Sequence, residues 1–127
     1  MVFQPAINEE LAATAIWGAQ HIHLYDQPDI DGVFGLWYGK GPGLDRALDA
    51  IRHANMGGVS KFGGMVLAVG DDATGKSSTL AYQSEQTLIA AGVPFFYPRS
   101  LHDIIPMGLM AFALSRQAGC CVGMKIV

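Results

Sequence analysis

Strand-like and helix-like segments alternate along this chain, and the alternation restricts its fold more than any other feature. Apolar runs typical of buried strands occupy residues 31–39, 63–69, 93–98 and 120–127. Helical patterns occupy residues 6–20, which Pro5 or Asn8 could start, and residues 44–55, 77–92 and 100–119, the last capped by Ser100. Helices between consecutive strands join parallel neighbours and cover both faces of a sheet. The pattern therefore predicts a single α/β domain over residues 1–127.

Composition excludes several classes of protein. Half of the 127 residues are hydrophobic, enough for a core, and the net charge of −3 gives no general attraction to nucleic acid or acidic membranes. No apolar run approaches the length of a membrane span. The two cysteines, Cys120 and Cys121, are adjacent and too few for a zinc site. Reduced thiols suit the cytoplasm, and we expect no metal site within the chain.

Three loops are expected to share one edge of the sheet. In open parallel sheets, ligands bind beyond the carboxyl ends of the strands. Residues 39–43, 70–78 and 97–100 each follow a predicted strand. We therefore expect these loops to form the functional edge.

The second of these loops carries the letters of a phosphate-binding P-loop, Gly70-x-x-x-x-Gly75-Lys76-Ser77. An apolar strand precedes it and a predicted helix follows, as phosphate binding requires. Asp71 and Asp72, however, would lie beside the phosphate oxygens and repel them. No later predicted strand ends in an acidic residue able to hold Mg²⁺. We therefore interpret the match to the P-loop motif as coincidence and keep nucleotide binding through Gly70–Ser77 as the alternative function.

Four blocks of sequence, in the same order, resemble the thiamine pyrophosphate-dependent indolepyruvate:ferredoxin oxidoreductases of the large fused type. These blocks read NEELAATAIWGAQ, DGVFGLWYGKGPGLDRALDAIRHAN, GGMVLAVGDDATGKSSTLAYQSEQ and GCCVGMKIV. The resemblance covers nearly the whole chain and is to the pyrimidine-binding domain of that family. It implies a parallel sheet of about five strands with helices on both faces, truncated at its N-terminus. It also implies oxidative decarboxylation of aryl 2-oxo acids to acyl-coenzyme A, with ferredoxin receiving the electrons.

The resemblance assigns roles to particular residues. Glu9 corresponds to the catalytic glutamate that contacts the ring nitrogen of the aminopyrimidine and favours its imino tautomer, with Asn8 beside it in the cofactor site. Asp71 and Ser77 are expected as further cofactor contacts. Lys40 is a candidate for binding the substrate carboxylate, although a turn lysine is often only solvated. From the residues alone, Asn8 and Glu9 would be an ordinary helix cap and a first-turn acid.

The remaining prominent side chains are expected to be structural. His53 lies on a predicted helix and is interpreted as a surface or structural residue. The large aromatic residues Trp17, Trp37, Phe95 and Phe96 are expected in the core rather than as a stacking platform.

Much of the machinery that the family uses is missing from these 127 residues. Gly70-Asp71-Asp72 is not the family's Gly-Asp-Gly motif for Mg²⁺ and diphosphate, and no cysteine cluster could carry iron–sulfur centres. Those groups would belong to partner domains of the enzyme, and the chain could also form a homo-oligomer. We expect the isolated chain to show no oxidoreductase activity. A third interpretation is an assembly or regulatory domain that keeps the fold without the chemistry.

Overall fold

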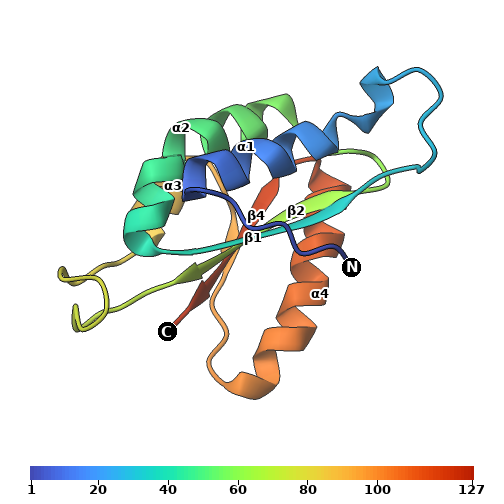
Figure 1. The fold of residues 1–127 in the computed structure, drawn as a ribbon. Coiled ribbons are helices and arrows are strands. Elements are labelled where there is room, and N and C mark those ends of the chain that lie inside the picture. Colours follow the sequence, from blue (N-terminus) through green and yellow to red (C-terminus); the bar gives the residue numbers. More distant parts are fainter.

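A computed structural model describes all residues, 1–127, and shows a three-layer α/β arrangement (Figure 1). The elements in chain order are α1 (Glu9–Gln20), a 3₁₀ turn η1 (Ile22–Leu24), β1 (Phe34–Lys40), α2 (Gly41–Gly57), β2 (Gly64–Gly70), α3 (Glu85–Ala90), β3 (Phe95–Phe96), α4 (Leu101–Ala118) and β4 (Cys121–Ile126). The α/β class and the four strand-like segments expected from the sequence are confirmed.

The sheet is entirely parallel and has the strand order β1-β2-β4-β3. The expectation of about five strands is wrong, because residues 1–7 remain exposed coil and join no ladder. The third strand is also shorter than its apolar segment, since only Phe95 and Phe96 pair with β4. A parallel sheet of this order places the ends of all four strands on the same side.

Helices cover both faces of the sheet, as predicted. Helices α1, α2 and α3 pack on one face over a core that includes Trp37, Ile51 and Leu67, and α4 packs alone on the other face against Val66 and Val122 (Figure 1). Trp37 is the largest fully buried side chain, which confirms its expected place in the core. Trp17, Phe95 and Phe96 are half-buried and pack against the margins of the two core clusters.

Two helices near the carboxyl ends of the strands differ from their predicted bounds. Helix α2 begins at Gly41, within the expected turn, because the fixed φ of Pro42 suits the first turn of a helix. The helix predicted for residues 77–92 is mostly absent, since α3 spans only Glu85–Ala90. Positive φ angles at Gly75 (69°) and Thr79 (68°) break any helical path through the preceding loop.

Helix α4 follows its predicted course. Ser100 and Asp103 form a capping box at its start, and Gly119 (φ 71°) ends it in the left-handed conformation. The helix continues through Pro106. None of the helices combines the length and apolar character that crossing a membrane requires.

Candidate functional site

The carboxyl ends of the strands meet the start of α2, the loop of residues 71–84 and the segment before α4. Lys40 ends β1, Gly70 ends β2, and the register pairs Lys40 with Gly70 and Gly70 with Ile126. The three loops that the sequence placed together therefore do share one edge of the sheet.

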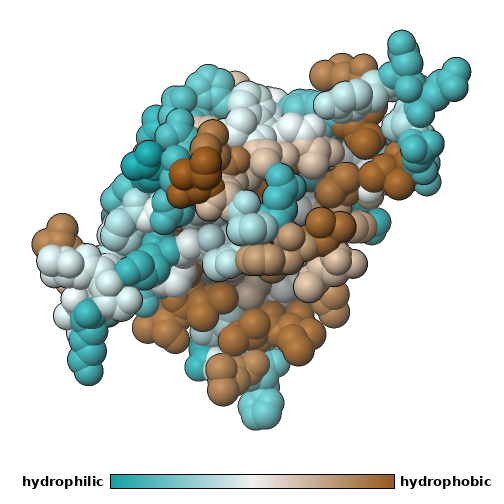
Figure 2. All heavy atoms as spheres, viewed as in Figure 1, coloured by the Kyte–Doolittle hydropathy of each residue, from teal (hydrophilic) through white to brown (hydrophobic).

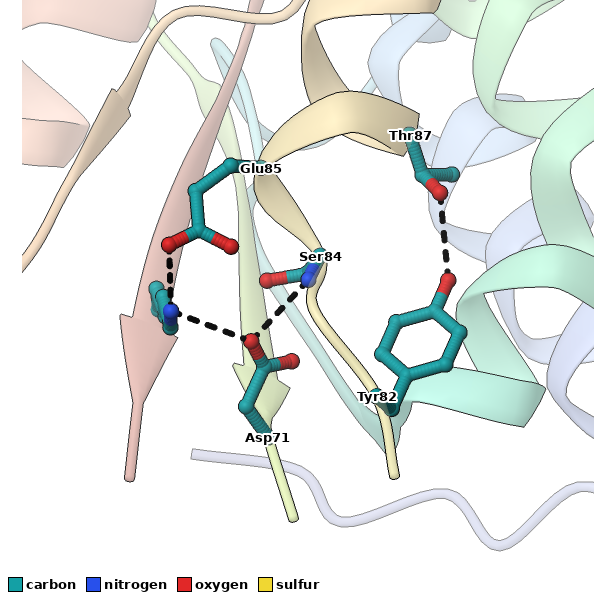
Figure 3. A network of polar contacts seen from close by, with 6 residues as sticks. Asp71, Tyr82, Ser84, Glu85 and Thr87 are labelled. Carbon is teal, nitrogen blue, oxygen red and sulfur yellow. Dashed lines mark hydrogen bonds and ion pairs between the residues drawn. The ribbon is translucent and has the colours of Figure 1, made fainter. Parts of the chain in front are cut away.

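A buried ion cluster holds the loop 71–84 against this edge. The ammonium of Lys125, on β4, lies 3.3 Å from Oδ2 of Asp71 and also pairs with Oε1 of Glu85 at the start of α3. Figure 3 shows the carboxylates of Asp71 and Glu85 directed toward the same point, and Ser84 donates its backbone N–H to Asp71 at 3.0 Å. The side chain of Asp71 is only 1% exposed. One cation thus ties the end of β2 to α3.

Electrostatics within the cluster favour the charged forms. Burial alone would lower the pKa of Lys125, but its hydrogen bonds to Glu85 and Asp71 outweigh burial and raise it. The hydrogen bond from Lys125 lowers the pKa of Glu85 in return. The ammonium also lies 4.7 Å from the centre of the Tyr97 ring, a cation–π distance. These contacts give Asp71 a structural role, and its predicted contact with a cofactor stays a prediction.

Lys125 was missed by the sequence analysis. It is the one charged residue in the strand Cys121–Ile126, which is otherwise apolar. A charge in a buried strand needs a partner, so this position could have been paired in advance with one of the loop carboxylates.

The letters of the P-loop adopt a different structure. Oδ2 of Asp72 accepts the backbone N–H groups of Ser77 (2.5 Å) and Ser78 (3.1 Å), and Oδ1 accepts the hydroxyl of Thr74. The hydrogen bond from Ser77 is the main cause that lowers the pKa of Asp72. In a P-loop such amides would face a phosphate, and a helix would follow directly. Here a carboxylate of the protein binds the amides and no helix begins at Ser77.

Lys40 and Ser77, two predicted site residues, contact each other. The ammonium of Lys40 donates to the backbone carbonyl of Ser77 at 2.6 Å and lies 3.3 Å from its hydroxyl. A substrate carboxylate would have to displace these contacts, so the predicted binding role of Lys40 stays a prediction. His53 lies elsewhere, exposed on α2, with Nδ1 within 2.9 Å of the carbonyl of Asp49.

Tyr82 joins the same loop to α2 and α3. Its hydroxyl donates to Oδ1 of Asp45 at 2.7 Å. It also lies 3.2 Å from the hydroxyl of Thr87 (Figure 3). Its ring fills the space over Gly41, where a Cβ would lie 1.9 Å from Cδ1 of Tyr82. Gly41 therefore lets the loop pack directly on the start of α2.

Because of Tyr82, we expect the stability of the fold to decrease at alkaline pH. Burial, with the carboxylate of Asp45, raises the pKa of Tyr82 from 10.0 to about 12. The unfolded chain loses this proton near pH 10 and the folded chain only near 12, so the stabilisation is complete below pH 10 and is lost as the pH rises through about 12. We expect Tyr82→Phe to flatten the fall of the melting temperature over this range, while Tyr25→Phe, at an exposed tyrosine, leaves it unchanged. Equal slopes in both variants would contradict the assignment.

Glu9 is the first residue of α1, and its carboxylate lies over the start of α2. Asn8 caps the helix by accepting the N–H of Leu11 at 2.9 Å, and the backbone carbonyl of Glu9 accepts the indole N–H of Trp37 at 3.0 Å. A Cβ at Gly43 would lie 2.6 Å from Cγ of Glu9, so only glycine there allows this approach. The cap role of Asn8 is confirmed, and the main chain of Glu9 is fixed by the core.

A cavity of about 510 Å³ lies beside Glu9. Thirteen of its 18 lining residues are hydrophobic, and Glu9 shares the wall with Trp37 and Tyr38 of β1 and with the N-terminal segment 2–8. Glu9 takes part in none of the ion pairs of the structure. A half-buried carboxylate beside an apolar cavity suits a flat ring with a polar edge.

Comparisons with protein-family models, curated proteins and solved structures found no match to this chain. The structure also contains no group of three or more His, Cys, Asp or Glu side chains placed to hold a metal ion. The fold and the site together define an α/β domain with a parallel sheet and two sets of charged side chains at the carboxyl edge of that sheet. These are the free carboxylate of Glu9 and the Asp71–Glu85–Lys125 cluster.

Proposed function

We propose that this chain binds the aminopyrimidine ring of thiamine pyrophosphate, as part of a 2-oxoacid:ferredoxin oxidoreductase that acts on aryl 2-oxo acids such as indolepyruvate. The observation that carries the proposal is the position of Glu9. Its carboxylate is half-buried at the carboxyl edge of the sheet, has no ionic partner and faces a glycine across the start of α2.

The residues around Glu9 fit such a ring. The cavity supplies apolar walls for the faces of a heterocycle, and Glu9 supplies one acceptor or donor for its edge. The indole N–H of Trp37 donates to the backbone carbonyl of Glu9, and the Asn8 side chain caps the first turn of α1. The carboxylate is therefore presented from a rigid position, as proton control at a ring nitrogen requires.

When bound, thiamine pyrophosphate supplies the electron sink for decarboxylation. The contribution of this chain is to orient the ring and to exchange a proton at one ring nitrogen through Glu9. The diphosphate, Mg²⁺, the iron–sulfur clusters and the sites for coenzyme A and ferredoxin would be held by other domains of the enzyme, in the cytoplasm. We therefore expect the isolated chain to turn over no indolepyruvate, and measurable turnover would contradict this division of roles.

Thiamine is the direct probe for the site, because it carries the ring without the diphosphate. The chain has two tryptophans, so a ¹⁵N–¹H spectrum contains two indole signals. The Trp37 indole binds the carbonyl of Glu9, whereas the indole nitrogen of Trp17 lies near Gly57 at the far end of α2. We expect thiamine to shift the Trp37 signal and to leave the Trp17 signal in place.

The same spectra separate the nucleotide alternative. Mg-ATP bound in the manner of a P-loop would shift the amides of Ser77 and Ser78, which bind Asp72 in this structure. A shift confined to those amides with Mg-ATP, together with no response of Trp37 to thiamine, would overturn the proposal in favour of nucleotide binding.

A further inference from the structure

An apolar surface extends from β1 across to α4 and has no cover in this chain. We call it the β1–α4 surface, and its members are the exposed side chains Phe34, Leu36, Tyr38, Leu101, Ile105, Leu109 and Met110, all more than half exposed. Figure 2 shows hydrophobic atoms gathered over the lower part of the molecule, where α4 lies in Figure 1. An edge-to-face contact between Phe34 and Phe112, at 5.5 Å, makes the strand and the helix one continuous surface.

Helix α4 is apolar on its outer side as well as its inner side. Only Ala111 and Ser115 of its 18 residues are buried, and no charged residue occurs between Asp103 and Arg116. A helix that is hydrophobic all round is normally buried in the assembled protein. The outward face of β1 is equally uncharged from Phe34 to Tyr38. It stays exposed because α4 packs mainly against β2 and β4, with Phe112 touching β1 at Phe34.

The area of this surface matches half of a stable dimer interface. A large apolar side chain presents on the order of 150 Å² when fully exposed, so these seven side chains present roughly 700 Å². The largest apolar patch on a typical monomer is about 300–600 Å². A standard interface buries about 800 Å² on each partner. Polar residues around this surface would supply the remaining area.

We propose that a second copy of this chain covers the β1–α4 surface in a two-fold symmetric dimer. The outer side of α4 in each copy packs beneath the uncovered face of β1 in the other, so that the two copies of α4 lie side by side between the two sheets. The area favours this occupant, because it approaches what one side of a standard interface buries, and none of the seven side chains is charged, so the net charge of −3 on each copy is not brought into direct contact there. Phe34, Leu36 and Tyr38 also line the cavity beside Glu9, so the dimer would close one side of that cavity, but the evidence for the dimer does not depend on the cofactor proposal.

Mass measured by sedimentation velocity or light scattering tests this dimer. We expect twice the 13.5 kDa of one chain at concentrations of about 1–100 µM, the range in which interfaces of this size associate. Leu36→Asp and Leu109→Asp change opposite halves of the contact, and each should return the mass to that of the monomer. Met56→Asp, at an exposed apolar residue of α2 outside the surface, should leave the dimer intact.

Circular dichroism of each variant establishes that the fold is kept. A wild-type chain that stays at 13.5 kDa up to about 100 µM would overturn the proposal and indicate that a different protein or domain covers the surface. Oligomers that survive both aspartate variants would overturn it as well, because they would form through another surface.

Discussion

Replacing Trp37 by alanine is expected to lower the free energy of unfolding by about 3–5 kcal/mol, the range measured for large aromatic side chains removed from cores. Trp37 is 1% exposed and belongs to the larger core cluster, which α1, α2 and α3 cover. The change also removes the indole N–H that binds the carbonyl of Glu9 at 3.0 Å. It therefore leaves a cavity and frees the first turn of α1 at once.

Urea unfolding followed by circular dichroism measures this effect. Trp37→Phe should cost less, because the phenyl ring fills most of the space and only the hydrogen bond is lost. Phe62→Ala, at an exposed ring in the loop before β2, is the matched control and should change stability by less than about 1 kcal/mol. A loss at Trp37→Ala no greater than that of the control would show that the core is not organised around this side chain.

Lys125→Met has the second large expected effect. The change removes the only cation of the buried cluster and leaves Asp71, 1% exposed, without its charge partner. Breaking a buried pair from one side costs about 3–5 kcal/mol, and the partial exposure of Glu85 reduces this to about 2–4 kcal/mol. Replacing both partners removes the stranded charge, so Asp71→Asn combined with Lys125→Met should recover part of the loss.

The acid dependence of stability gives this second prediction an independent readout. The hydrogen bond from Lys125 lowers the pKa of Glu85 below its usual 4.5, so the contact stabilises the fold above that value and is lost as the pH falls through the lowered pKa. Lys125→Met should flatten this acid dependence. Lys76→Met, at an exposed lysine of the same loop, should change neither stability nor its pH profile. An acid dependence that persists in Lys125→Met would contradict the assignment to this cluster.

The fold class could be predicted because its signals are local. Apolar runs bounded by turns specify the strands, and Ser100 with Asp103 and Gly119 specifies the ends of α4. The loop 71–84 could not be predicted in the same way. Residues 77–84 read as helix-forming, but hydrogen bonds from the amides of Ser77 and Ser84 to Asp72 and Asp71 hold them in a non-helical path.

The contacts within the candidate site also depend on residues that are far apart in the sequence. The sequence placed Lys40 and Ser77 in separate loops of one edge, but nothing in it showed that they would bind each other. A charge in the apolar strand of Lys125 implies a partner, but its partners lie 40 residues or more before it, so their identity required the fold. The β1–α4 surface was also invisible, because β1 reads as a buried strand until the sheet order makes it an edge.

The affinity of the chain for thiamine, before and after changes at Glu9, measures whether this carboxylate contacts the ring. Glu9→Gln keeps the size of the side chain and removes its charge, and Glu10→Gln makes the same change one residue along, at an exposed position of the first turn. We expect Glu9→Gln to weaken thiamine binding by about tenfold or more, the effect of one charge-assisted hydrogen bond, and Glu10→Gln to leave it unchanged. Binding is followed at the Trp37 indole signal. Equal affinity of the two variants for thiamine, or chemical shifts that leave the Trp37 indole signal unchanged, would contradict a thiamine site at Glu9.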